Sequence, residues 1–340
     1  MKKERVAVLG STGIVGQAFV WLLSGHKLFE PFFLSASSSR SGKSYGDEVR
    51  WVFPFQMPET VINKKIETLD YSKLKELGIR IIFSALPFDV AKIVEPDLRK
   101  NGFWVFSNAG AMRNEVDVPI LIPEANLESL DLIKKQRFPG KGFVITNANC
   151  STTGIAVALA PLKKFGIIEV YLSTYQSVSG AGYPGLSALD ISGNAIPFIK
   201  DEEEKIEYEL KKILNFDADI YPYCVRVSTL FGYLETVWVK LEKSVKEDEM
   251  IEAWKTFGLK NVDLPSAPDA PIIYDHSDDF PQPKMSFFGT PSGMAVLVGR
   301  LRKKNDKIGF TLLVNNLIKG AAGGSIENAE AFLDRYGDKI

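Results

Sequence analysis

The chain has 340 residues, of which 45% are hydrophobic and 24% charged, with 41 basic and 42 acidic side chains. This near-average composition excludes collagen-like, coiled-coil and disordered classes, and the length predicts about two domains. A net charge of −1 gives no basic footprint for nucleic acid or for an anionic membrane surface. Two cysteines cannot build a disulfide framework, so we expect a cytoplasmic protein. The chain also has only two histidines, which leaves few candidates for a histidine base.

No apolar run approaches the length of about 18 residues that a membrane-spanning helix needs, so no membrane or targeting segment is expected. The first half of the chain alternates short apolar runs with helix-like segments. The expected strands are residues 5–9, 31–36, 80–86, 103–107 and 142–146. The expected helices are residues 17–23, 71–77 and 89–101, the last with Asp89 as its N-cap. This alternation predicts a Rossmann-like domain, in which helices cover a parallel sheet.

Longer strand-like runs with fewer helices follow residue 150. The expected strands are residues 169–177, 218–226, 235–241 and 295–302, and the expected helices are residues 151–165, 201–214 and 247–257. Residues 310–319 and 323–335 form a last strand or helix pair. The pattern predicts a second, α+β domain with an antiparallel or mixed sheet, so the fold class is α/β with two domains.

A glycine loop follows the first expected strand and opens a helix. It reads Gly10-Ser11-Thr12-Gly13-Ile14-Val15-Gly16. Glycines permit a tight turn and a close approach of the backbone to a pyrophosphate, which the N–H groups of the helix N-terminus then bind. We therefore predict a dinucleotide site here. The alternative is a structural strand-to-helix turn.

The end of the second strand selects between the two nicotinamide dinucleotides. An acidic residue there binds the ribose hydroxyls of NAD, but this chain has Ser37, Ser38, Ser39, Arg40, Ser41 and Lys43. Hydroxyl and cationic groups suit the 2′-phosphate of NADP. We predict NADP as the cofactor, and the alternative is a solvated polar turn.

Cys150 lies just after a strand and at the start of a helix, in Asn147-Ala148-Asn149-Cys150-Ser151-Thr152. A helix N-terminus favours the reactive thiolate, and the polar flanks argue against a buried structural thiol. A thiolate beside a dinucleotide domain can add to an aldehyde, give a hydride to nicotinamide and form a thioester. Cys224 lies in an apolar strand, where we expect a structural role.

Several spaced motifs together resemble one family over nearly the whole chain. They are Gly10–Gly16, Ser107-Asn108-Ala109, Asn149-Cys150-Ser151-Thr152, residues 176–182, residues 202–205, Arg226-Val227 and residues 315–324. The chain resembles the aspartate-β-semialdehyde dehydrogenase family, most closely its archaeal and fungal branch. The resemblance implies reversible NADP-dependent reduction of L-aspartyl-4-phosphate to aspartate semialdehyde, in lysine, threonine and methionine biosynthesis.

The resemblance also implies residue roles. Cys150 would be the nucleophile, and Gln176 would orient the acyl group. Arg226 would bind the substrate α-carboxylate, Glu202 the ammonium group, and Lys205 and Arg113 the phosphate, with Asn149 beside them. The implied cofactor contacts are Gly10, Ser11, Thr12, Gly13, Ile14, Val15, Gly16, Ser37, Ser38, Arg40, Ser41, Ser84, Ala85, Leu86, Asn108, Ser179, Gly180, Gly182 and Asn316. No metal ligand is expected.

For each of these residues a structural role is the alternative. Gln176 would satisfy a turn, Arg226 would form an ion pair, and Arg113 and the charged residues 201–205 would be solvated surface. The resemblance places residues 1–149 and about 318–340 in an NADP-binding domain, and residues 150–317 in a catalytic and dimerisation domain. It implies a homodimer or homotetramer whose ligands are the small-molecule substrate and inorganic phosphate, with no nucleic acid and no membrane. Residues 183–199 are a candidate contact or lid loop.

The sequence departs from the family at the general acid/base. The family has a histidine seven residues after the carboxylate-binding arginine, where this chain has Tyr233. His26 and His276 lie outside the family motifs, and we expect His26 to cap a helix or to be solvated. Tyrosine, with a pKa near 10, exchanges protons poorly at neutral pH, and losing a general base costs about 10²–10⁴-fold.

Three hypotheses follow from Tyr233. It substitutes as a hydrogen-bond donor or as an acid/base of lowered pKa. Alternatively, the chain reduces another acyl phosphate or an acyl thioester such as malonyl-CoA. Finally, it is a catalytically weak NADP-binding regulatory protein.

Overall fold

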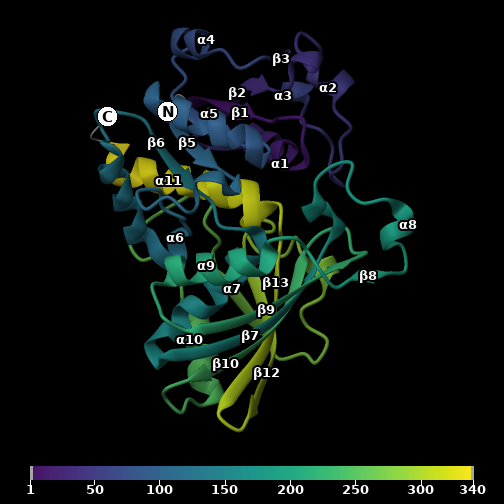
Figure 1. Cartoon of the computed structure of the whole chain (residues 1–340), viewed down its shortest axis with the longest axis vertical. Coiled ribbons are helices and arrows are strands. Elements are labelled where there is room, and N and C mark those ends of the chain that lie inside the picture. The colour runs from purple at the N-terminus through teal and green to yellow at the C-terminus, as the bar shows by residue number, and fades with distance from the viewer. Residues whose placement is uncertain (1–2, 338–340) are drawn as a thin grey trace. The chain divides into compact units, whose positions relative to one another are not determined.

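The computed structural model describes residues 3–337 and divides into two compact units (Figure 1). Unit 1 comprises Met1–Leu121, Glu128–Asn147 and Ser325–Ile340, and unit 2 comprises Ile122–Leu127 and Ala148–Gly324. The boundaries expected after residues 149 and 317 fall a few residues away from these. Nothing in the sequence indicates that Ile122–Leu127 belongs to unit 2.

Unit 1 is built on a six-stranded sheet in the order β3-β2-β1-β4-β5-β6, with every pair parallel. The strands are β1 (Glu4–Leu9), β2 (Phe29–Ser35), β3 (Ile66–Glu67), β4 (Ile81–Ser84), β5 (Trp104–Ser107) and β6 (Phe143–Thr146). All four residues of β4, β5 and β6 are buried, as expected for parallel strands covered on both faces. The Rossmann-like prediction is confirmed.

Helices connect these strands. Unit 1 contains α1 (Ile14–Ser24), α2 (Tyr45–Glu48), α3 (Glu59–Ile62), α4 (Tyr71–Glu76), α5 (Phe88–Lys100), most of α11 (Gly323–Tyr336), and short 3₁₀ turns at Ser38–Arg40, Gly110–Met112 and Leu127–Gln136. The predicted cap at Asp89 is wrong, because α5 begins at Phe88 with Pro87 as N-cap and Asp89 lies in the first turn. The prediction that His26 is solvated is also wrong. Its ring is 8% exposed and lies 2.6 Å from the Glu330 carboxylate, which gives it a buried polar partner.

Unit 2 is built on a seven-stranded mixed sheet in the order β11-β12-β13-β10-β7-β9-β8. The strands are β7 (Ile167–Gln176), β8 (Ala195–Ile196), β9 (Asp219–Val227), β10 (Tyr233–Leu241), β11 (Ile272–Asp275), β12 (Val296–Lys304) and β13 (Lys307–Val314). β10 is antiparallel to β7 and β13, whereas β7 and β9 are parallel. The predicted mixed sheet is confirmed.

One face of this sheet is buried beneath helices α7 (Cys150–Leu159) and α9 (Glu202–Leu214), which pack on β13 and β9 (Figure 1). Burial alternates strictly along β10, so that every second residue from Tyr233 to Leu241 faces the core. The predicted helix 151–165 ends early at Leu159, because Pro161 cannot continue it, and a 3₁₀ turn (Ala160–Phe165) follows. Residues 307–314 form a strand, and a π-helical turn (Ile318–Ala322) leads into α11.

The remaining helices of unit 2 are α6 (Pro123–Asn126), α8 (Ala188–Ile191), α10 (Glu247–Lys255) and 3₁₀ turns at Val178–Ala181 and Pro283–Met285. Residues 183–199, the candidate contact or lid loop, contain α8 and β8. No helix within residues 3–337 is long and apolar enough to cross a membrane.

Candidate active site

Cys150 is the first residue of α7, a helix of ten residues whose N-cap is Asn149. Asn149 Oδ1 accepts hydrogen bonds from the backbone N–H of Ser151 at 3.0 Å and from its hydroxyl at 2.7 Å. The Cys150 side chain is partly exposed, so it can meet a ligand. A positive helix N-terminus stabilises a thiolate placed there.

Gly320, in the π-helical turn, packs directly against the nucleophile. A Cβ atom at this position would lie 3.0 Å from Cys150 Cβ, which only glycine avoids without a shift. π-helical turns recur at functional sites, and here the turn brings its backbone against Cys150.

Three side chains of the expected site form a row across the buried face of the sheet. Gln176 of β7 pairs with Arg226 of β9, and the register of β10 with β7 continues this row to Tyr233. All three are buried, with exposures of 0%, 7% and 1%. The register of three strands therefore brings together residues that lie far apart in sequence.

Only the nitrogen of the Gln176 side-chain amide has hydrogen-bond partners among the described residues of unit 2. Its Nε2 donates to Thr174 Oγ1 at 3.2 Å and to Glu202 Oε1 at 3.1 Å. Its buried Oε1 has no hydrogen-bond partner among residues 3–337. The amide therefore does not satisfy a turn, and its buried oxygen is an acceptor without a donor among the described residues.

Arg226 is a buried cation that donates to the Ser177 carbonyl at 2.8 Å and to the Tyr233 hydroxyl at 3.4 Å. Within the described part of the chain it forms no ion pair, so the alternative of a structural ion pair is wrong. Burying an arginine away from a carboxylate is costly, and an anionic ligand would offset that cost.

Glu202 begins α9 and is 7% exposed. Its carboxylate accepts hydrogen bonds from Asn149 Nδ2 (3.1 Å), Ser151 Oγ (3.2 Å) and Gln176 Nε2 (3.1 Å). The alternative that Glu202 is a solvated residue at the start of a helix is therefore wrong. Lys205 lies one turn further along α9, half-buried, and no carboxylate among residues 3–337 pairs with it.

Tyr233 is fully enclosed. Burial raises the pKa of its hydroxyl well above the usual value, and the charge of the neighbouring Cys150 adds to the shift. The hypothesis of a lowered pKa is therefore wrong, because a site that excludes water disfavours the phenolate. The hydrogen-bond-donor arm of that hypothesis stays a prediction. Gly180 makes room for the hydroxyl, since a Cβ there would lie 1.7 Å from the Tyr233 oxygen.

Asn316 links the loops that frame Tyr233. Its Oδ1 accepts from the Gly232 backbone N–H at 3.0 Å and from the Ser177 hydroxyl at 3.2 Å, and its Nδ2 donates to Ser179 Oγ at 2.9 Å. These bonds hold the loop after β7 to the loop before β10. Ser179 is 4% exposed, whereas Gly182 is half-buried and has a φ of +77°.

Sequence reasoning missed Glu209, which is 1% exposed on α9. Its Oε2 accepts from the backbone N–H of Asn149 at 2.6 Å and so holds the N-cap of α7. Spacing offered a signal, because Glu209 follows Glu202 by two helical turns and shares its face. Cys224 has the expected structural role, and burial raises the pKa of its thiol to about 12.

Arg113 lies in unit 1 and is 7% exposed, so the alternative of a surface arginine is wrong. Its Nε donates to the Asn147 carbonyl at 2.9 Å and its Nη2 to the Asn108 carbonyl at 3.1 Å. Asn108 in turn donates to Ser325 Oγ at 3.0 Å. The guanidinium group is thereby fixed at the end of the parallel sheet, where ligands of such folds bind.

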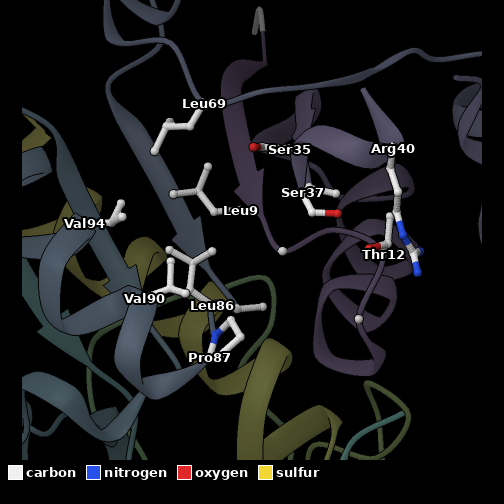
Figure 2. Close-up of a pocket in the computed structure, with 14 residues that line it drawn as sticks. Leu9, Thr12, Ser35, Ser37, Arg40, Leu69, Leu86, Pro87, Val90 and Val94 are labelled. Carbon is white, nitrogen blue, oxygen red and sulfur yellow. The ribbon is translucent and has the colours of Figure 1, made fainter. Parts of the chain in front are cut away.

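A cavity of about 480 Å³ opens beside the glycine loop of unit 1 (Figure 2). Thr12, Ser37 and Arg40 lie on one side of it, and apolar side chains including Leu86 and Val90 lie on the other (Figure 2). The expected residues that line the cavity are Gly10, Thr12, Gly13, Ser37, Arg40, Ala85 and Leu86. The cavity therefore has apolar walls next to the guanidinium group of Arg40.

The other expected cofactor residues of unit 1 lie outside this lining: Ser11, Ile14, Val15, Gly16, Ser38, Ser41, Ser84 and Asn108. Ser11 and Ser84 are completely buried, and Ser11 donates to the Ser35 carbonyl. Gly16 supports the loop from below, since a Cβ there would lie 2.1 Å from the Gly10 carbonyl oxygen. Val90 and Val94 were missed, although their spacing of four on a predicted helix marks a shared face.

Two family models match the chain. The semialdehyde dehydrogenase NAD binding domain matches residues 5–133, and the semialdehyde dehydrogenase dimerisation domain matches residues 159–319. The chain belongs to the semialdehyde dehydrogenase family. Apart from Ile122–Leu127, the first matched range lies in unit 1, and the second lies in unit 2.

Individual relatives agree with this assignment. The chain is 41% identical to an aspartate-semialdehyde dehydrogenase of Archaeoglobus fulgidus, covering 96% of this chain and 97% of that protein. It is 36% identical to a malonyl CoA reductase (NADP) of Metallosphaera sedula, covering 98% of both chains. A crystal structure of aspartate semialdehyde dehydrogenase with NADP from Candida albicans superposes with a TM-score of 0.87 at 31% identity, covering 98% and 99%.

The burial of Tyr233 predicts how its hydroxyl titrates. The phenolate absorbance that is lost on Tyr233→Phe should appear only well above pH 10, because desolvation disfavours the charged form. The measurement is the difference between the alkaline titrations of the wild type and of that variant, with exposed Tyr223→Phe as the matched control. A Tyr233 component that titrates below pH 10 contradicts the burial argument.

Proposed function

We propose that this family member is an NADP-dependent, phosphorylating aspartate-semialdehyde dehydrogenase. It reversibly converts L-aspartyl-4-phosphate and NADPH into L-aspartate 4-semialdehyde, phosphate and NADP, in lysine, threonine and methionine biosynthesis. The observation that carries the proposal is that unit 2 holds both a buried Glu202 carboxylate and a buried Arg226, and that Arg226 has no ion-pair partner within residues 3–337. These charges complement the ammonium and α-carboxylate groups of an amino acid held beside Cys150.

Cys150 supplies the covalent step. Its thiolate attacks the acyl carbon of the aspartyl phosphate, a carbon–sulfur bond forms, and phosphate leaves with the electron pair of the broken carbon–oxygen bond. NADPH, when bound, supplies the hydride that reduces the resulting thioester. Collapse of the reduced adduct releases the aldehyde and restores the thiolate. We assign the orientation of the acyl group to the side-chain amide of Gln176 and to the backbone N–H groups at the N-terminus of α7, which can donate to the acyl oxygen.

Tyr233 acts as a hydrogen-bond donor. Because its pKa is raised by burial, the hydroxyl keeps its proton across the physiological range and cannot serve as a base. A donor that faces Cys150 can stabilise the charge that develops on the acyl oxygen, a contribution typically worth about 10²–10³-fold in rate.

The cavity of unit 1 suits NADP. Gly10 and Gly13 let the backbone approach a pyrophosphate, and Arg40 lines the cavity where a 2′-phosphate would be read. The side chain of Arg40 lies 3.7 Å from Glu48 and that of Lys43 lies 2.9 Å from the same carboxylate, so Glu48 holds both cations near the cavity. We assign the phosphate of the substrate to Lys205 and Arg113.

We also infer a homodimer, or a homotetramer, that forms through the outer face of the seven-stranded sheet. This face carries stacked Tyr171 and Tyr221, with ring centroids 4.8 Å apart, and Tyr223 at 70% exposure. Large exposed aromatics of this kind are typical of interfaces. Two cysteines in 340 residues are too few for a disulfide framework, which suits a reducing cytoplasm.

Malonyl-CoA reduction is the second candidate, supported by the malonyl CoA reductase relative. Malonyl-CoA has no amino group for Glu202 to bind, which favours the aspartyl substrate. An NADP-binding regulatory protein without turnover is the third candidate, and the retained Cys150 and Glu202 argue against it.

Phosphate-dependent reduction of NADP by aspartate semialdehyde tests the proposal. The wild type should turn over aspartate semialdehyde faster than malonyl-CoA is reduced in a parallel assay. Cys150→Ala should lower kcat on the order of 10⁴-fold or more, because no other group replaces the nucleophile, and Cys224→Ala is the matched control. Tyr233→Phe should lower kcat about 10²–10³-fold through the lost donor.

Three outcomes contradict the proposal. Turnover that survives Cys150→Ala overturns the thioester route. A preference for malonyl-CoA makes the second candidate correct. An inactive wild type that gains activity on Tyr233→His shows that Tyr233 does not support catalysis.

Replacement of Arg40 tests the cofactor. Arg40→Ala should raise KM for NADP about 10–100-fold while leaving KM for NAD unchanged, because a charge-assisted bond to the 2′-phosphate is lost. Lys27→Ala, an exposed cation of the same unit, is the control. Equal changes for both cofactors would show that Arg40 does not read the 2′-phosphate.

A further inference from the structure

Glu235 is a buried carboxyl group that the proposed reaction does not use. Its side chain is 0% exposed, and neither carboxyl oxygen has a hydrogen-bond partner among residues 3–337. A buried carboxylate without donors is strongly disfavoured. Burial, with the nearby charge of Glu202, raises the pKa of Glu235 well above its usual value, so its surroundings favour the protonated, neutral form.

The strand register places Glu235 directly behind the active-site row. It follows Tyr233 by two residues on the buried face of β10 and pairs across the strands with Thr174 of β7. Thr174 Oγ1 accepts from Gln176 Nε2, and the same Nε2 donates to Glu202 Oε1. A continuous set of contacts therefore joins the row of Glu235 to the carboxylate of Glu202.

The two carboxyl groups have opposite surroundings. Among the residues that the structure describes, three side chains donate to Glu202 and none donates to Glu235, so the negative charge of the pair belongs on Glu202. The charge of Glu202 on α9 acts on Glu235, and the charges of Glu202, Glu203 and Glu235 act on Cys224, which lies in the same row on β9. Tyr233 lies two residues away on the same strand, and β13 presents Leu312. Arg226 is the buried cation of the neighbouring row. Two close carboxyl groups with one proton are the arrangement in which a small change of charge moves that proton.

We propose that Glu235 is the second carboxyl group of the ammonium subsite, which holds the proton of the pair while the subsite is empty and releases it when a cationic amino group binds beside Glu202. The inference rests on the proposed function, which assigns that amino group to Glu202. An ammonium ion beside the pair stabilises a second negative charge and so lowers the pKa of Glu235. The O–H bond of Glu235 breaks, its electron pair stays on the carboxylate, and the proton passes to solvent or buffer.

The consequence is selectivity for an amine. Binding that releases a proton becomes tighter as pH rises, until the amino group of the ligand itself loses its proton. A substrate analogue without an amino group draws no proton from Glu235 and gains nothing. Glu235 is therefore a specificity-determining residue for amino-acid substrates.

The experiment measures protons released when a ligand binds. The full chain with Cys150→Ala binds aspartate semialdehyde without turnover, and a pH-indicator dye in weak buffer near neutral pH reports the release. We expect a fractional proton release with aspartate semialdehyde and none with 4-oxobutanoate, which lacks the amino group. Addition of Glu235→Gln, the neutral isostere, should abolish the release, whereas Glu204→Gln on the exposed face of α9 should retain it.

The variants at Glu202 and Glu235 distinguish a failure of this inference from a failure of the proposed function on which it rests. If Glu202→Gln leaves the affinity for aspartate semialdehyde unchanged, the proposed ammonium site is wrong. Two outcomes overturn only the role of Glu235, provided that binding depends on Glu202. In the first, the Cys150→Ala chain releases no proton on binding; in the second, it releases as many protons after Glu235→Gln is added. An infrared measurement needs no change at Glu235: the protonated-carboxyl band of the Cys150→Ala chain should weaken on binding aspartate semialdehyde, and an unchanged band overturns the inference.

Discussion

The buried carboxylate of Glu202 is the constraint on which the site depends. A carboxylate removed from water needs donors, and Glu202 obtains them from two segments of unit 2: the start of α7 through Asn149 and Ser151, and the end of β7 through Gln176. Each donor thereby becomes fixed. Cys150 lies between two of them in sequence, so the interaction that compensates the buried charge also holds the nucleophile in place.

The strand register of the seven-stranded sheet arranges the side chains around the site in two neighbouring rows. The row of Gln176, Arg226 and Tyr233 faces the site, and the row of Thr174, Cys224 and Glu235 lies behind it. In the front row a cation without an ion-pair partner is buried, while in the back row burial suppresses the charge of Cys224 and Glu235. The front row therefore carries a charged side chain, Arg226, whereas burial favours the neutral forms of Cys224 and Glu235 in the back row.

Much of this could be predicted from the sequence. Alternating apolar runs predicted the parallel sheet of unit 1, and longer runs predicted the mixed sheet of unit 2, because burial on one or two faces leaves a periodic signature. Spacing alone placed Cys150 at a helix start. The helix end at Leu159 was missed because the apolar pattern continues through Pro161, and the buried state of His26 was missed because its partner Glu330 lies 304 residues away. Glu235 looked like an ordinary strand residue, since only the cross-strand register shows what lies beside it.

The covalent role of Cys150 is the central claim, and trapping the acyl-enzyme tests it most directly. Aspartate semialdehyde and NADP, mixed with the protein in the absence of phosphate, should leave an aspartyl group on Cys150, because no acceptor removes the acyl group from the thioester. Mass spectrometry of the acid-quenched protein and its peptides should locate the adduct at Cys150, with none when NADP is omitted or when Cys150 is replaced by alanine. An unmodified Cys150, or an adduct on another residue under conditions of turnover, would contradict the account.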